Sequence, residues 1–145
     1  MSRRRARMAA LQVLFAADVG RTPEEIAFKH VLEETALQPG DASFARELVV
    51  GVLRHCRELD RLLEQYSVGW QINRMPAVDR NILRLGLYEL LYLGEEIPPS
   101  VAINEAIELA KVFSEEEAGP FINGVLDSIR RDLETGKIPR NSIRD

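Results

Sequence analysis

Residues 76–91 read PAVDRNILRLGLYELL, and this stretch decides the fold class. Pro76 suits the first turn of a helix, and Gly94 and Pro98 supply the breaks that follow. Glu89 falls on the apolar face, so we expect a buried carboxylate with a structural partner rather than a general acid. A helix that is apolar on nearly all sides is typical of the centre of a helical fold, and the apolar residues here are Val78, Ile82, Leu83, Leu85, Leu87, Leu90 and Leu91.

Apolar residues spaced three and four apart predict five more helices and no strands, which makes the chain all-α with six to seven helices. We expect these helices at about residues 3–19, 23–38, 41–65 and 100–113, and a last one up to residue 134 that follows a possible capping box at Ser114–Glu117. The periodicity fails at Ser67-Val68-Gly69-Trp70. This interruption predicts two packed three-helix bundles, at about residues 1–67 and 76–134, within one domain of residues 1–134. Residues 135–145, which contain Gly136, Pro139 and Asn141, are predicted to form a flexible tail.

The composition fits one compact domain in a reducing compartment. The chain has 145 residues, a hydrophobic share of 46% and a net charge of −4. Its single cysteine, Cys56, excludes an internal disulfide, which is typical of cytoplasmic proteins. The apolar run at residues 8–17 imitates a signal peptide, but Gln12 interrupts it and Asp18 follows it. We therefore expect a cytoplasmic protein without a membrane-spanning segment.

Catalytic and metal sites are not predicted. His30 and His55 fall in different predicted helices, and with one cysteine they fall short of the roughly four ligands that zinc requires. The motifs of nucleophile elbows, P-loops and dinucleotide-binding turns are absent. We expect Cys56 to be a core residue, and we expect no enzyme activity and no cofactor.

A basic cluster opens the first predicted helix, at Arg3, Arg4, Arg5 and Arg7. Positive charge at a helix N-terminus opposes the helix dipole by about 0.3–1 kcal/mol per exposed charge. Two interpretations stay open: a solvated, frayed end, or a binding site for phosphate, which the planar guanidinium groups suit. Arg4 and Arg7 lie three residues apart, so on a helix they can follow one nucleic-acid backbone together.

Further candidates for nucleic-acid contact lie along the chain. Gln12 is suited to reading a base edge, and Phe15 either stacks on a base or packs in the core. Arg80 and Arg84 lie four residues apart and either extend the basic surface or pair with acidic side chains within the chain.

Three segments of the sequence resemble the NusB family. The opening RRRAR at residues 3–7, followed by ALQVLF, is similar to the arginine-rich start of that family. The stretch from VDRNILRL to YEL, residues 78–90, is similar to its central helix. The most specific match is VAINEAIELAK at residues 101–111, followed by FINGVLD at residues 121–127. The resemblance covers nearly the whole chain and is weakest at residues 20–43 and in the tail.

The resemblance implies a function as well as a fold. Members of the family are all-helical, with two three-helix bundles, and bind boxA RNA together with a small-subunit ribosomal protein, NusE. That assembly modifies RNA polymerase and suppresses premature termination, notably in ribosomal RNA operons. The ribosomal protein is expected on the second bundle, including the helices at residues 76–93 and 100–113. An apolar patch kept for a partner also allows a homodimer that hides the RNA surface.

The resemblance also assigns RNA-binding residues. Position 15 is often tyrosine in relatives, and Phe15 keeps the stacking ring but loses a hydroxyl hydrogen bond. The first group of implied contacts is Arg3, Arg4, Arg5, Arg7, Gln12 and Phe15. A second group is expected on the same surface and comprises Asp79, Arg80, Phe121 and Asn123.

Two other functions remain open. The same kind of domain occurs at the N-terminus of an RNA cytosine methyltransferase, so the chain is alternatively a detached piece of such an enzyme. It is alternatively a helical adaptor that binds only proteins, in which the arginines serve solubility. Salt-dependent retention of RNA separates the adaptor from an RNA-binding factor.

Overall fold

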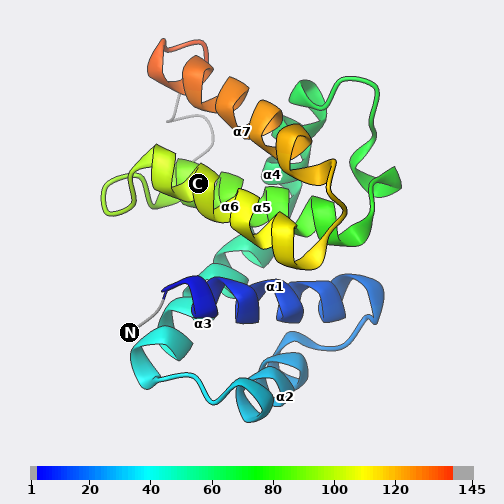
Figure 1. Ribbon diagram of the computed structural model, residues 1–145, viewed down its shortest axis with the longest axis vertical. Coiled ribbons are helices and arrows are strands. Elements are labelled where there is room, and N and C mark those ends of the chain that lie inside the picture. The colour runs from blue at the N-terminus through cyan, green and yellow to red at the C-terminus, as the bar shows by residue number, and fades with distance from the viewer. Residues whose placement is uncertain (1–2, 139–145) are drawn as a thin grey trace. The chain divides into compact units, whose positions relative to one another are not determined.

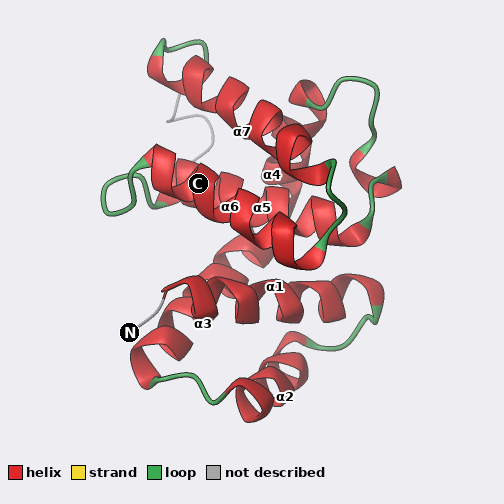
Figure 2. Ribbon diagram, viewed as in Figure 1, coloured by secondary structure: helices red, strands yellow, loops and turns green. Residues whose placement is uncertain are grey.

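The computed structural model describes residues 3–138, and every regular element in that range is helical (Figure 2). The predicted all-α class is therefore confirmed. Over the described range the chain forms seven α-helices and one short 3-10 turn: α1 (Arg3–Val19), α2 (Glu24–Thr35), α3 (Pro39–Arg54), α4 (Cys56–Tyr66), η1 (Ile72–Arg74), α5 (Ala77–Tyr92), α6 (Pro99–Phe113) and α7 (Ala118–Glu134).

Two compact units divide the chain, residues 1–54 and residues 55–145. Helices α1, α2 and α3 make up the first unit, and α4 to α7 belong to the second. Our division of one domain at about residues 1–67 and 76–134 stays a prediction. So does the flexible tail at residues 135–145, of which residues 139–145 lie outside the described part.

In the first unit, α1 packs against both α2 and α3 (Figure 1). Small and branched side chains of α1 allow this close packing, and they are buried: Ala6, Ala9, Ala10, Leu11, Val13 and Leu14. Helix α2 ends at Thr35, earlier than its periodicity predicts. Ala36 turns the backbone into the left-handed region at φ 51°, and its N–H donates to the Leu32 carbonyl at 3.1 Å, which closes the last turn.

The second unit is built around α5, which contacts α4, α6 and α7. Ile82, Leu83 and Leu87 are fully buried, and Glu89 is 1% exposed, as its place on the apolar face predicts. Gly86 lets α5 approach its neighbours closely. A Cβ built there would meet the Leu126 side chain of α7 at 2.7 Å and the Ala106 Cβ of α6 at 3.3 Å.

The predicted single helix at residues 41–65 is wrong, because the structure has two helices there, α3 and α4. The backbone leaves the helical conformation at His55, with φ −107° and ψ 18°. The His55 ring stacks on Tyr92 of α5 at 4.3 Å between centroids. Apolar residues keep their spacing through the break, so the periodicity alone does not reveal it.

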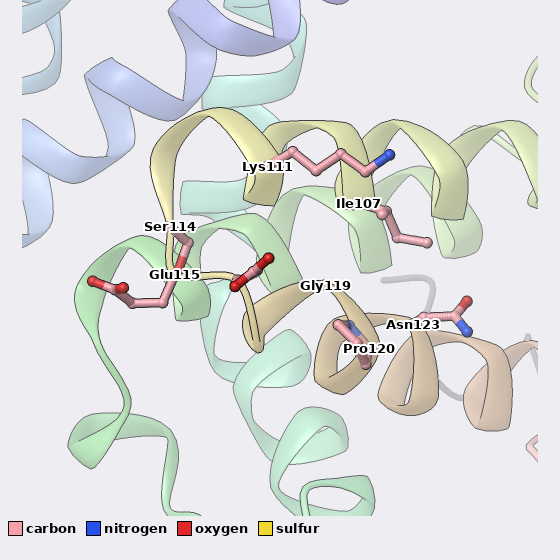
Figure 3. A pocket seen from close by; sticks show the side chains of 8 residues that line it. Ile107, Lys111, Ser114, Glu115, Gly119, Pro120 and Asn123 are labelled. Carbon is pink, nitrogen blue, oxygen red and sulfur yellow. The ribbon is translucent and has the colours of Figure 1, made fainter.

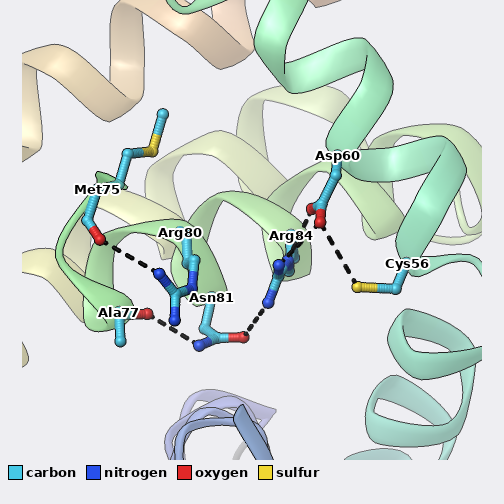
Figure 4. Close-up of polar contacts among 7 residues, drawn as sticks. All are labelled: Cys56, Asp60, Met75, Ala77, Arg80, Asn81 and Arg84. Atoms are coloured by element: carbon cyan, nitrogen blue, oxygen red, sulfur yellow. Dashed lines mark hydrogen bonds and ion pairs between the residues drawn. The ribbon is translucent and has the colours of Figure 1, made fainter. Parts of the chain in front are cut away.

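A polar network joins α4 to α5 (Figure 4). The Arg84 guanidinium donates to both carboxylate oxygens of Asp60, each at 2.8 Å, and also to Asn81 Oδ1 at 3.1 Å. The Arg84 side chain is only 12% exposed, so this pair is shielded from solvent. Arg84 is therefore an internal bridge rather than part of a basic surface. Cys56 is half-buried rather than fully in the core, and its thiol points to the same Asp60 carboxylate at 3.8 Å.

Helix α4 is also tied to α7. The Tyr66 hydroxyl at the end of α4 donates a hydrogen bond to the Asp132 carboxylate of α7. Burial, together with the bond to Asp132, raises the pKa of Tyr66 to about 12. This contact and the Asp60–Arg84 pair fix two sides of α4 within the second unit.

Alanine substitution of two helical glycines, one at the close contact of α5 and one at an open position of α7, tests the packing of α5. Gly86→Ala adds a methyl group against Leu126 and Ala106, and overpacking of a core costs about 1–3 kcal/mol. Gly124→Ala in α7 meets nothing within 4 Å, so only the helix-propensity gain of roughly 0.5–1 kcal/mol remains. In urea unfolding, the free energy of unfolding of Gly124→Ala should therefore be higher than that of the parent chain, and that of Gly86→Ala should be lower than that of Gly124→Ala. Equal stabilisation by both changes would contradict the close approach at Gly86.

Candidate nucleic-acid interface

One face of α1 is open along most of the helix. Arg4, Gln12 and Phe15 share it, because steps of eight and three residues return to the same side of a helix. Arg4 and Phe15 are exposed and Gln12 is half-exposed. Met8 and Val19 fall on the same side. We call Arg4, Met8, Gln12, Phe15 and Val19 the α1 stripe.

Phe15 lies at the surface. Its side chain is 38% exposed, although Leu11 and Leu14 beside it are almost fully buried. Packing of Phe15 in the core, the alternative that the sequence left open, is therefore wrong. A half-open aromatic ring on a helix surface is available for stacking on a base.

Arg3, Arg5 and Arg7 make contacts inside the first unit. Arg5 donates to the carbonyl oxygen of Thr35 at 2.9 Å and so caps the C-terminus of α2, where the helix dipole favours a cation. The guanidinium of Arg3 lies over the Phe44 ring of α3 at 4.3 Å, and that of Arg7 lies 5.5 Å from the same ring. Arg7 is only 4% exposed. Arg7 is therefore packed against Phe44. That Arg4 and Arg7 follow one phosphate backbone together stays a prediction.

In the second unit, Asp79 and Arg80 lie in the first turn of α5. Asp79 is buried and accepts a hydrogen bond from the Ser114 hydroxyl, at the residue that ends α6. Arg80 is half-buried, and its guanidinium donates to the Met75 carbonyl at 3.4 Å. Both side chains therefore have a structural role at the start of α5.

Phe121 and Asn123 lie on α7, and their environments differ. Phe121 is half-buried, and its ring lies 6.4 Å from the Trp70 ring. Asn123 is exposed and lines two adjoining cavities of about 690 and 480 Å³ between α6 and α7. In Figure 3, Ile107 and Lys111 of α6 line one side of the larger cavity, and Pro120 and Asn123 of α7 line the other.

Trp70 was missed as a candidate for function. Sequence reasoning treated residues 67–70 as a boundary, yet Trp70 is 50% exposed and faces Phe121. The backbone N–H of Trp70 donates to the Ser67 carbonyl at 2.9 Å, and Gly69 takes φ +83°. A tight turn therefore carries the indole ring at the surface. The sequence did hold a signal for an exposed aromatic ring, because Trp70 follows turn residues and belongs to no apolar periodicity.

Metal-binding clusters and membrane-spanning helices are not found among the described residues. Between residues 3 and 138 no group of three or more His, Cys, Asp and Glu side chains is placed to hold a metal ion. Within the same range no helix is both long and apolar enough to cross a bilayer.

Comparison with known proteins identifies relatives over almost the full length. The NusB family model matches residues 4–131. The transcription antitermination protein NusB of Bacillus pumilus is 47% identical over 134 residues, with 92% of this chain and 98% of the relative covered. The protein of the same name from Desulforamulus reducens is 46% identical, with 89% of this chain and 90% of the relative covered.

Solved structures agree with these relatives. The T. maritima NusB structure is 36% identical and superimposes with a TM-score of 0.84, covering 95% of this chain and 99% of the other. A crystal structure of the antitermination factors NusB and NusE in complex with dsRNA is 34% identical, with a TM-score of 0.81. It covers 89% of this chain and 96% of the matched chain.

Alanine variants of Arg4 and Arg7, which lie one turn apart on α1, distinguish an exposed arginine from one that stabilises the fold. Arg7→Ala removes a buried guanidinium from Phe44, and a desolvated cation–π contact contributes up to about 2 kcal/mol. Arg4→Ala removes the same charge from the same end of α1, but at an exposed position, and should change stability by less than about 0.5 kcal/mol. We expect thermal unfolding to show a clear loss for Arg7→Ala alone. Similar midpoints for the two variants would contradict the structural assignment of Arg7.

Proposed function

The chain belongs to the NusB family, and on that premise we propose that it binds boxA-type RNA together with the small-subunit ribosomal protein NusE. It is an RNA-binding transcription antitermination factor and not an enzyme. With RNA and NusE it joins the antitermination complex of RNA polymerase and suppresses premature termination, notably in ribosomal RNA operons. We place this activity in the cytoplasm, where transcription occurs.

The α1 stripe is the observation that carries the proposal. It offers three kinds of contact along one helix face: a cation at Arg4, an amide at Gln12 and an aromatic ring at Phe15. Arginine suits phosphate, an amide suits a base edge, and a ring stacks on an unpaired base. This combination suits single-stranded RNA, whose bases can be splayed out.

Among the basic residues, we propose a division of labour. Arg4 contacts phosphate directly, whereas Arg3, Arg5 and Arg7 mainly hold α1 in place through Phe44 and the end of α2. In the second unit, Asp79 and Arg80 shape the start of α5, while Phe121 and Asn123 offer contacts from α7.

The charge balance supports the need for a partner. The whole chain carries a net charge of −4, so its general field repels RNA. A basic partner such as a ribosomal protein would enlarge the positive surface that the RNA meets. We propose that NusE binds the second unit, where α6 exposes the apolar residues Val101 and Val112. A homodimer that covers the α1 stripe stays a prediction.

Fluorescence anisotropy of a labelled boxA-type RNA tests the function. We expect the chain to bind this RNA more tightly than a scrambled sequence, and the preference to grow when NusE is present. Affinity should fall as salt rises, because arginine–phosphate contacts release counterions. Equal binding of both RNAs in the presence of NusE would leave a protein-binding adaptor as the better description.

Variants of the α1 stripe test where the RNA lies. Arg4→Ala should weaken binding and reduce the slope of log affinity against log salt by about 0.7, the value for one phosphate contact on a single strand. Phe15→Ala should cost about 1–3 kcal/mol of binding and leave the salt slope unchanged. Arg61→Ala, an exposed arginine of α4, is the control with the same loss of charge. An Arg4→Ala variant that behaves like Arg61→Ala would refute a phosphate contact at Arg4.

A further inference from the structure

A small cavity in the second unit lies beside Trp70 and Phe121. Its volume is about 230 Å³, and it is lined by both aromatic rings and by Met75, Asp79, Glu115 and Glu117. Pockets for drug-sized ligands hold roughly 300–1,000 Å³, so this one fits a smaller planar group.

We propose that this cavity holds one splayed base of the bound RNA, stacked on Trp70, and that its carboxylates favour a base with an amino group. The inference rests on the proposed function and adds a residue, Trp70, and a base preference to it. Two lining residues, Asp79 and Phe121, belong to the proposed RNA-binding set, so the cavity continues that surface.

The aromatic walls are arranged for one base rather than for a chain of bases. The Trp70 and Phe121 rings are tilted by 59° with centroids 6.4 Å apart, so they form two neighbouring walls and not a parallel clamp. A base that stacks on the indole therefore meets the Phe121 ring at an angle. A backbone hydrogen bond from the Trp70 N–H to the Ser67 carbonyl, 2.9 Å long, closes the turn that carries Trp70.

The charge of the lining sets which part of the RNA enters. Glu115 and Glu117 are exposed acidic residues, and they disfavour a phosphate at this position. Carboxylates accept hydrogen bonds from amino groups such as N4 of cytosine. Uracil is the one RNA base without an exocyclic amino group, so it is the base least suited to this cavity.

Trp70 is the only tryptophan of the chain, so intrinsic tryptophan fluorescence reports on this cavity alone. We would titrate boxA-type RNA into the chain and into its complex with NusE. The same titrations with the Trp70→Phe variant give the background emission. RNA should change the emission of Trp70. RNAs with a single abasic site at each position should identify one position whose loss removes that change.

Variants separate stacking from general apolar contact. Trp70→Leu keeps an apolar side chain but lacks a ring face, and it should weaken RNA binding roughly 5- to 100-fold by anisotropy. Trp70→Phe should recover most of that loss. At the position found by abasic scanning, uracil should bind less tightly than cytosine, and Glu117→Gln should narrow that ratio. Circular dichroism spectra that match the parent would show that each variant is folded.

Three results would overturn the proposal. The first is RNA binding with normal affinity by Trp70→Leu. The second is emission that RNA does not change while the RNA still binds, which leaves the proposed function intact. The third is a Trp70 emission that changes when NusE is added and does not change again when RNA follows. That result would assign the cavity to a cationic side chain of NusE. Failure of the parent chain to bind RNA at all would instead overturn the proposed function, and this proposal with it.

Discussion

Burial of α5 is the constraint on which the second unit depends. This helix carries apolar side chains on nearly every side, so it is stable only when α4, α6 and α7 cover it. Gly86 allows two of those helices to approach closely, and the Asp60–Arg84 pair fixes the third. Asp79, at the start of α5, then holds the end of α6 through Ser114. The packing of one helix thus sets the frame in which Phe121 and Trp70 are presented.

In the first unit, α1 combines a structural role with the RNA-binding role that we propose, on different faces of the helix. Its small buried residues and three of its arginines hold α2 and α3, through the Thr35 carbonyl and the Phe44 ring. On the opposite face Arg4 and Phe15 are exposed and Gln12 is half-exposed. Arg3, Arg5 and Arg7 therefore also have contacts within the first unit. The RNA-binding role of the four arginines stays a prediction.

Periodicity predicted the helical class and the central place of α5, because both depend on the apolar pattern alone. It did not predict the break at His55, since the apolar residues keep their spacing across it and the departure is a local backbone turn. The contact of Arg7 with Phe44 was not predicted either, because spacing on a helix does not say which arginine meets an aromatic ring of another helix. Trp70 was missed for a related reason: its exposure depends on a turn and on Phe121, 51 positions further along the chain. Local pattern predicts elements, whereas the use of a side chain depends on contacts between elements.

Amide chemical-shift mapping tests the central claim most directly. The chain, labelled with 15N and bound to unlabelled NusE, would be titrated with boxA-type RNA. The account predicts that the largest shift changes on adding RNA fall along the α1 stripe, with little change on the exposed face of α4. RNA-induced changes that avoid α1 and gather on α4 or elsewhere would contradict it, because the α1 stripe that we propose as the RNA-binding face would then have no RNA on it.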